Sequence, residues 1–159
     1  EPTLLGTGGE RRSSASAPRA VQEPHTHYDP ATLALVLLAE DNAENIAVMQ
    51  EYITRHGYRV ETARDGHEAV TRAEELRPAV ILMDIQMPGM NGLEAIARIR
   101  ANPALADVPI IALTALAMPG DRERCMAAGA SGYLSKPVGL RDLVRAIEAH
   151  RSTAQEQRQ

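Results

Sequence analysis

Short apolar runs alternate with amphipathic stretches along most of the chain. The runs at 33–39, 79–83 and 108–114 are almost continuously apolar, which is typical of strands that are covered on both faces of a sheet. The segments 58–63 and 131–135 have weaker but similar strand patterns. The hydrophobic pattern therefore predicts five strands.

The stretches between these runs have the spacing of helices with one apolar face. After the first strand, Ile46, Met49 and Ile53 fall on a single helical face. Asp65 stands three residues before a glutamate, which is close to a capping box at a helix N-terminus, and Pro119 is suited to open the fourth helix. We expect helices at 43–57, 65–77, 91–101, 119–129 and 139–151.

Five strands that alternate with five helices predict an α/β fold. Short strands linked by helices imply parallel neighbours, right-handed crossovers and a sheet with helices on both sides. In such sheets the functional site lies beyond the carboxyl ends of the strands. The pattern thus indicates where chemistry is expected before any motif is considered.

The first 31 residues differ from the rest. They contain several prolines and glycines and a run of serine and alanine, without any helical or alternating period. This composition is typical of a flexible linker. We expect a linker over 1–31, one folded domain over 32–151 and a polar tail over 152–159.

Charge and cysteine content exclude several classes of protein. The net charge of −4 argues against a body that binds nucleic acid, and no apolar run approaches the roughly 18–20 residues that span a membrane. The single cysteine, Cys125, excludes an internal disulfide and suits a reducing cytoplasm. We expect a cytoplasmic monomer that contacts neither nucleic acid nor membrane. The chain has no initiator methionine, so we expect it to be an excised piece of something longer or a processed product.

Polar side chains stand where the predicted strands end. Glu40 and Asp41 follow the first strand, Asp84 the third, Thr114 the fourth and Lys136 the fifth. Because the carboxyl ends of parallel strands share one edge, we expect these residues to converge. Three carboxylates repel one another, and Lys136 offsets only one negative charge. A hard divalent cation that prefers oxygen ligands, such as Mg²⁺, would offset the remaining negative charge.

Each of these residues alone has an ordinary explanation. An aspartate at a strand end is more often a helix cap or a turn residue than a nucleophile. Thr114 alone suits a strand end, and Lys136 alone suits a solvated surface. Only their combination at one predicted edge favours a functional site.

Four stretches resemble the receiver domain of two-component response regulators. They are AEDNAEN, MDIQMPGMNG, ALTA and YLSKP, and they occur in the order and spacing of that family over roughly residues 33–150. The residues of these motifs are similar to those of receivers attached to hybrid sensor histidine kinases. The resemblance implies a flavodoxin-like, doubly wound (βα)5 fold whose five-stranded parallel sheet has the order 2-1-3-4-5.

The resemblance also implies a site for phosphoryl transfer. Asp84 would take a phosphoryl group from a phosphohistidine, carried by a histidine kinase or a histidine phosphotransfer protein. Asp41 and Asp84 would ligate Mg²⁺ directly, Glu40 would help through water, and the backbone carbonyl of Gln86 would supply a further ligand. Transfer to Asp84 and later dephosphorylation would be catalysed by the domain itself.

The remaining implied roles concern the switch. Lys136 would pair with Asp84 and then with the phosphoryl oxygens, and Pro137 would follow a cis peptide that aims Lys136 inward. Thr114 would donate its hydroxyl to the phosphoryl group, and Tyr133 would enter the space that Thr114 leaves. The face of the fourth helix, fifth strand and fifth helix would then change shape. For Tyr133, the alternative of a half-exposed strand residue without a switching role stays open.

Three other functions compete with this one. A flavodoxin-like cofactor binder needs a loop rich in glycine, serine and threonine after the first strand, where this chain has AEDNAEN. A haloacid-dehalogenase-type phosphatase also has an aspartate nucleophile, but that family has the pattern DxDx[TV] after its first strand, whereas Asp84 follows the third strand here, in DIQMP. A pseudo-receiver, which binds proteins without being phosphorylated, stays open.

Overall fold

Five strands and five α-helices alternate along the part of the chain that the structure describes. This structure is a computed structural model, and it describes residues 33–115 and 118–157, with side chains as far as Arg151. The strands are β1 (Leu35–Ala39), β2 (Arg59–Ala63), β3 (Val80–Asp84), β4 (Ile110–Thr114) and β5 (Gly132–Ser135). The helices are α1 (Ala43–Arg55), α2 (Gly66–Leu76), α3 (Gly92–Ala101), the short 3₁₀ helix η2 (Pro103–Leu105), α4 (Asp121–Ala128) and α5 (Leu140–Gln157).

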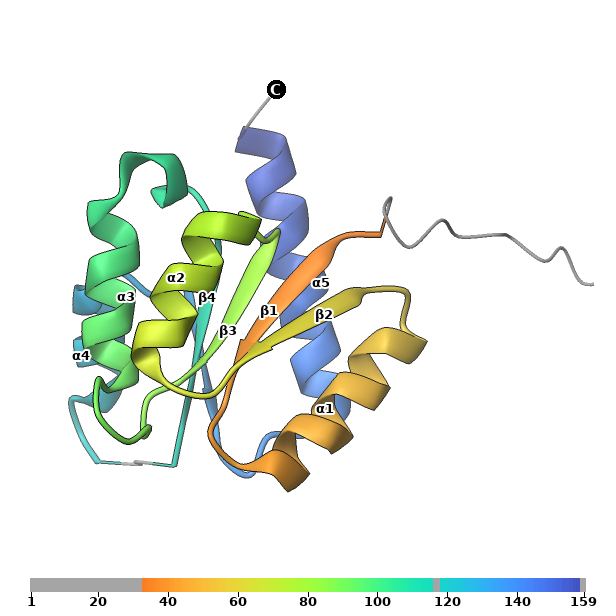
Figure 1. Ribbon diagram of the computed structural model, residues 1–159, viewed down its shortest axis with the longest axis horizontal. Helices are drawn as coiled ribbons and strands as arrows, with labels where there is room; N and C mark the ends of the chain where they lie inside the picture. The colour runs from red at the N-terminus through yellow and green to blue at the C-terminus, as the bar shows by residue number, and fades with distance from the viewer. Residues whose placement is uncertain (1–32, 116–117, 158–159) are drawn as a thin grey trace, which may run out of the picture.

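The strands form one parallel sheet with the order β2-β1-β3-β4-β5 (Figure 1). This confirms the predicted flavodoxin-like fold and its strand order. Every residue of β1, β3 and β4 is buried, as their continuous apolar sequences predict for strands with helices on both sides. Of the residues expected to form the site, Asp84 and Thr114 end β3 and β4, and Glu40 and Asp41 directly follow β1.

Two hydrophobic layers cover the sheet. On one face, Met49 and Ile53 of α1 pack with Leu143 and Ile147 of α5. On the other face, α2, α3 and α4 contribute small and branched side chains, among them Ile96. Figure 1 shows α1 and α5 together on one side and α2, α3 and α4 on the other. None of the helices in the described ranges is long and apolar enough to cross a membrane.

Side-chain caps fix where three of the helices begin. The side chains of Asn42, Asp65 and Asn91 each accept a hydrogen bond from a backbone N–H in the first turn of the helix that follows. These caps hold the loops at the carboxyl edge of the sheet. The expected linker at 1–31 lies outside the described residues, and α5 continues past the boundary expected at 151 to Gln157.

The prediction that Pro119 opens the fourth helix is wrong. That helix begins at Asp121, because Gly120 has a φ of +94° and breaks helical geometry directly after the proline. The Asp121 carboxylate accepts a hydrogen bond from the backbone N–H of Met118 at 2.9 Å. The turn that this bond closes replaces the expected first helical turn.

At the amino edge of the sheet, Arg100 joins four segments. Its guanidinium donates to the backbone carbonyls of Gly129 (2.7 Å), Leu105 (3.0 Å) and Ala106 (3.2 Å), and to the hydroxyl of Ser131 (3.1 Å). Arg100 therefore ties the end of α3 to η2, to the end of α4 and to the start of β5. This edge lies opposite the predicted site.

Candidate functional site

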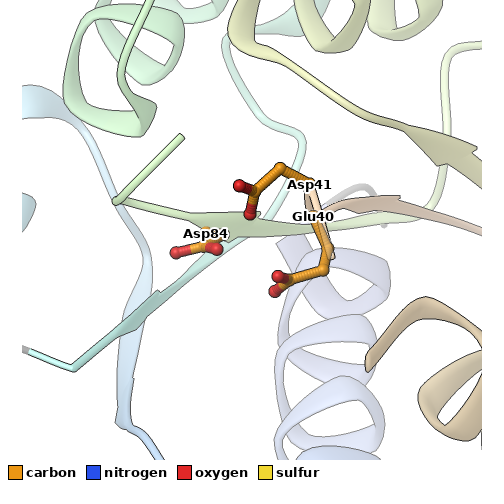
Figure 2. Close-up of side chains that lie close together, drawn as sticks. All are labelled: Glu40, Asp41 and Asp84. Carbon is orange, nitrogen blue, oxygen red and sulfur yellow. The ribbon is translucent and has the colours of Figure 1, made fainter. Parts of the chain in front are cut away.

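Three carboxylates meet at the carboxyl edge of the sheet. Glu40 and Asp41 follow β1, Asp84 ends β3, and one carboxylate oxygen from each lies within 4.8 Å of the others. Glu40 and Asp84 are only 1% and 2% exposed, whereas Asp41 is open to solvent. Figure 2 shows the three side chains gathered at the ends of these two strands. The predicted convergence of the acidic residues is thus present.

Lys136 is the cation that faces this cluster. Its Nζ donates to Asp84 Oδ2 at 2.9 Å and to Glu40 Oε2 at 3.1 Å. Burial by itself lowers the pKa of Lys136, but the hydrogen bonds and charges of Asp84 and Glu40 outweigh burial and raise this pKa above its usual value. The peptide bond between Lys136 and Pro137 is cis. Lys136 is also the only lysine in the chain.

The backbone around Asp84 fixes its position. The N–H of Gln86 donates to Asp84 Oδ1 at 3.0 Å, so both oxygens of this carboxylate accept a hydrogen bond. A Cβ at Gly92 would collide with the backbone carbonyl of Asp84. Glycine at the start of α3 therefore lets the helix pack directly against the end of β3.

Glu40 is held from the α1 side. The backbone N–H of Asn42 donates to Glu40 Oε1 at 3.3 Å, and Asn45 Nδ2 lies 3.5 Å from the same oxygen. Its other oxygen is taken by Lys136. Both carboxylate oxygens of Glu40 therefore have hydrogen-bond partners, as a buried polar group requires.

Thr114 lies at the end of β4, and Tyr133 lies on the neighbouring strand β5. Thr114 ends β4 with only 1% of its surface exposed, and its backbone carbonyl accepts a hydrogen bond from the Lys136 N–H at 2.8 Å. Tyr133 is half-buried against the core on the α4 side of the sheet. The role of both residues in a switch stays a prediction.

A groove of about 510 Å³ opens next to the acidic cluster. Glu40 and Lys136 form part of its wall, while Val48 and Met49 from α1 and Leu140 from α5 supply apolar surface. Val48 is 54% exposed, so its apolar side chain faces solvent. The site therefore opens toward solvent beside an apolar rim.

The side chains present fit a small divalent cation. Three carboxylates against one ammonium leave an excess of two negative charges in the cluster, and their oxygens are the hard donors that Mg²⁺ prefers. One of the three, Asp41, faces solvent, so a cation with bound water has access.

The residues of the site were predicted from the sequence more completely than the contacts between them. The prediction paired Lys136 with Asp84 but did not foresee the second contact with Glu40. The close packing of Gly92 on Asp84 was also missed. A glycine directly after the Asn91 cap was the only available signal for it, and such glycines also occur in ordinary turns.

Comparison with known proteins places this geometry in a family. The response regulator receiver domain family model matches residues 36–148. The polar-differentiation response regulator DivK of Brucella anthropi is 38% identical over 115 residues, which cover 72% of this chain and 94% of DivK.

Solved structures agree with this match. The receiver domain of a Pseudomonas aeruginosa sensor histidine kinase, with a magnesium ion coordinated in its active-site cleft, has a TM-score of 0.70 and 42% identity, and the match covers 75% of this chain and 98% of that one. The chemotaxis response regulator CheY4 of Vibrio cholerae has a TM-score of 0.71 and 33% identity, with 75% and 99% of the two chains covered.

Proposed function

The chain belongs to the response regulator receiver family, and on this premise we propose that Asp84 accepts a phosphoryl group from a phosphohistidine of a partner protein. The observation that carries this proposal is the buried Asp84 carboxylate, which shares Lys136 with Glu40, and both Lys136 and Glu40 line an open groove. A buried carboxylate needs such compensation to remain charged. A charged carboxylate is the form that can attack phosphorus.

The proposed reaction exchanges one bond for another. An oxygen of Asp84 attacks the phosphorus, the bond from phosphorus to the histidine nitrogen breaks, and the imidazole of the partner leaves. No oxidant or reductant takes part. Phosphoryl transfer depends mainly on positioning and on neutralising charge, and the backbone of Gln86 together with Gly92 positions the nucleophile.

The acidic cluster would hold Mg²⁺ through Asp41 and Asp84, with Glu40 acting through water and the backbone carbonyl of Gln86 as a further ligand. When bound, this ion supplies positive charge to the phosphoryl oxygens and to the attacking carboxylate. Lys136 contributes the other positive charge. Its two carboxylate contacts keep it in place before the phosphoryl group arrives.

Phosphorylation would then bias the structure between two states. Thr114 ends the strand next to β3 and would donate its hydroxyl to a phosphoryl oxygen. Tyr133 would follow into the space behind Thr114, and the α4-β5-α5 face would change shape. A local change in charge at Asp84 would thus alter the shape of the α4-β5-α5 surface.

The apolar rim supports a protein as the phosphoryl donor. Val48 and Leu140 flank the opening beside Lys136, so an imidazole carried on a histidine kinase or a histidine phosphotransfer protein would find apolar surface around the acidic centre. Exposed apolar surface next to a polar site is typical of protein interfaces. The apolar rim would serve equally well in a receiver that is part of a hybrid kinase and in a receiver that is a separate regulator.

We also propose that residues 32–151 are the domain that carries this function, in a cytoplasmic monomer. The folded elements and the family match fall almost entirely within these bounds. Cys125 is the single cysteine and is buried, which suits a reducing compartment.

Intact-mass measurement after incubation with acetyl phosphate tests the proposal. We expect the chain to gain one phosphoryl group when Mg²⁺ is present, and to gain none after chelation of the metal. Asp84→Asn should gain none under either condition, while Asp65→Asn, at the cap of α2, serves as a matched control.

Two further readings separate failure of the chemistry from failure of the fold. Circular dichroism must show that Asp84→Asn keeps its helices. A folded wild-type chain that gains no phosphoryl group with Mg²⁺ would overturn the proposal in favour of a pseudo-receiver, which binds proteins without phosphorylation.

A further inference from the structure

A second groove lies between α1 and α5, and it has a different chemistry from the site. Its volume is about 310 Å³, and its wall consists of Tyr52, His56, Arg141, Val144, Arg145 and Glu148. None of these residues belongs to the phosphoacceptor site. Beneath the groove, Ile53 and Ile147 belong to the same buried cluster, so the groove lies above a closed core.

Two arginines stand one helical turn apart along this groove. Arg141 and Arg145 are both exposed, and residues four apart on a helix are neighbours on its surface. Within the described part of the chain, neither forms an ion pair, whereas the exposed Arg55 and Arg98 are each paired with a glutamate on their own helix. The groove therefore presents two guanidinium groups that are available to a ligand.

The floor between these arginines is partly apolar. Val144 is buried at 5% exposure, and the Tyr52 ring lies 4.4 Å, centroid to centroid, from the ring of His56. His56 Nδ1 lies 2.9 Å from the Tyr52 carbonyl. A carbonyl can only accept, so Nδ1 donates there and Nε2 remains for a ligand. Aromatic and arginine side chains around an apolar floor are typical of protein-binding surfaces.

The charges facing the groove favour an anionic partner. Glu148 is the acidic member of its wall, against Arg141 and Arg145. Glu51, which lies next to Tyr52 on α1, is already paired with Arg55 at 2.6 Å. The Asp142 carboxylate lies near Gly139, the residue that precedes α5, and does not line the groove. Carboxylates form forked, charge-assisted hydrogen bonds with guanidinium groups.

We propose that the α1–α5 groove binds an acidic segment of a partner protein, with an apolar side chain over Val144 and Tyr52 and carboxylates on Arg141 and Arg145. The groove has room for one or two side chains, which suits a peptide segment. A nucleic acid fits less well, because its backbone needs a row of basic groups along successive phosphates, whereas this groove has two arginines beside a partly apolar floor. This interaction is separate from phosphoryl transfer and does not depend on it.

A synthetic peptide tests this inference in the unphosphorylated, metal-free chain. The probe is a fluorescein-labelled decapeptide of glutamate and leucine with its leucines one helical turn apart, and binding is followed by fluorescence anisotropy. We expect saturable binding that is weakened about tenfold or more when Arg141 and Arg145 are both changed to glutamate. The control is Arg122→Glu, because Arg122 is an exposed arginine on α4, on the other side of the sheet. It should bind like the wild type.

Amide chemical shifts locate the binding. Under the inference, the peptide shifts the resonances of Tyr52, His56 and Val144 more than those of α3. Where the double glutamate variant loses its fold by circular dichroism, the pair of glutamine substitutions replaces it, with a smaller loss of affinity expected.

Three outcomes would overturn the inference. They are the absence of saturable binding, equal weakening by Arg122→Glu, and shifts confined to residues outside the groove. A single-stranded RNA oligonucleotide that displaces the peptide, and whose own binding needs the same two arginines, would assign the groove to nucleic acid and would also reject the acidic-protein partner.

Discussion

Lys136 Nζ lies 2.9 Å from Asp84 Oδ2, although the two residues are 52 positions apart in the sequence and lie at the ends of β5 and β3, which are not neighbours in the sheet. The same Nζ contacts Glu40. One ammonium thus holds two buried carboxylates in place. The stability of this edge of the sheet depends on that ammonium keeping its proton.

The first prediction concerns alkaline pH. Because the pKa of Lys136 is raised in the folded chain, its contribution to the free energy of unfolding is fully present below the unfolded value of about 10.4. That contribution is lost as the pH rises through the folded pKa. Lys136 is the only lysine, so selective ¹³C-lysine labelling gives one Cε resonance, and we expect its titration midpoint in metal-free protein to exceed about 10.4.

Two variants check the cause of this shift. Asp84→Asn removes one of the two negative charges that Lys136 contacts, so the midpoint should fall toward the usual value. Glu148→Gln removes a carboxylate from the surface of α5 and should leave the midpoint unchanged. A wild-type midpoint at or below about 10.4 would contradict the geometry of the site.

The second prediction concerns Mg²⁺ and stability. Binding of Mg²⁺ to the folded chain alone should raise the free energy of unfolding, by about 2.7 kcal/mol at a concentration one hundred times the dissociation constant. Urea unfolding with and without Mg²⁺ measures this gain. Asp41→Asn should reduce it strongly, because Asp41 belongs to the acidic cluster, whereas Asp107→Asn, outside that cluster, should retain it. An equal gain in Asp41→Asn would place the ion elsewhere.

The third prediction concerns Gly92. In Gly92→Ala the new methyl group would collide with the backbone carbonyl of Asp84, so α3 or the end of β3 has to move. We expect a loss of about 1–3 kcal/mol in the free energy of unfolding together with slower phosphorylation by acetyl phosphate. Gly139→Ala is the matched control, because its methyl group would meet only the flexible carboxylate of Asp142. If both variants phosphorylate at the wild-type rate, the packing of Gly92 does not position Asp84.

The fourth prediction concerns Arg100. Arg100→Leu removes the donor for three backbone carbonyls and the Ser131 hydroxyl. We expect this to cost about 2–4 kcal/mol in urea unfolding. Arg98→Leu, two residues away, loses only an exposed pair with Glu94 and should change stability by less than about 1 kcal/mol. Similar losses in the two variants would show that the four contacts add little to stability.

The strands and helices were largely predictable because each has its own period. Continuous apolar runs marked β1, β3 and β4, and the alternating faces of α1 and α5 were visible in their spacing. The acidic cluster was predictable for a topological reason, because parallel strands end at one edge. Neither prediction needed knowledge of side-chain contacts.

The contacts that were missed depend on backbone atoms and on reach. Arg100 binds carbonyl groups, which every residue has, so no residue type in the sequence marks its partners. The start of α4 was misplaced because Pro119 is compatible with the first turn of a helix, while the left-handed conformation of Gly120 is visible only in the folded chain. The contact from Lys136 to Glu40 depends on the length of the lysine side chain.

The contacts of Arg100 have a consequence for how the two edges of the sheet respond to solution conditions. All four of its hydrogen-bond acceptors are uncharged oxygens, so a divalent cation has no carboxylate acceptor to take from Arg100; Asp107 acts on Arg100 through its charge alone. The opposite edge is made of carboxylates and one ammonium. A divalent cation therefore has its carboxylate ligands at the carboxyl edge of the sheet, while the hydrogen bonds that anchor the amino edge offer it no charged acceptor.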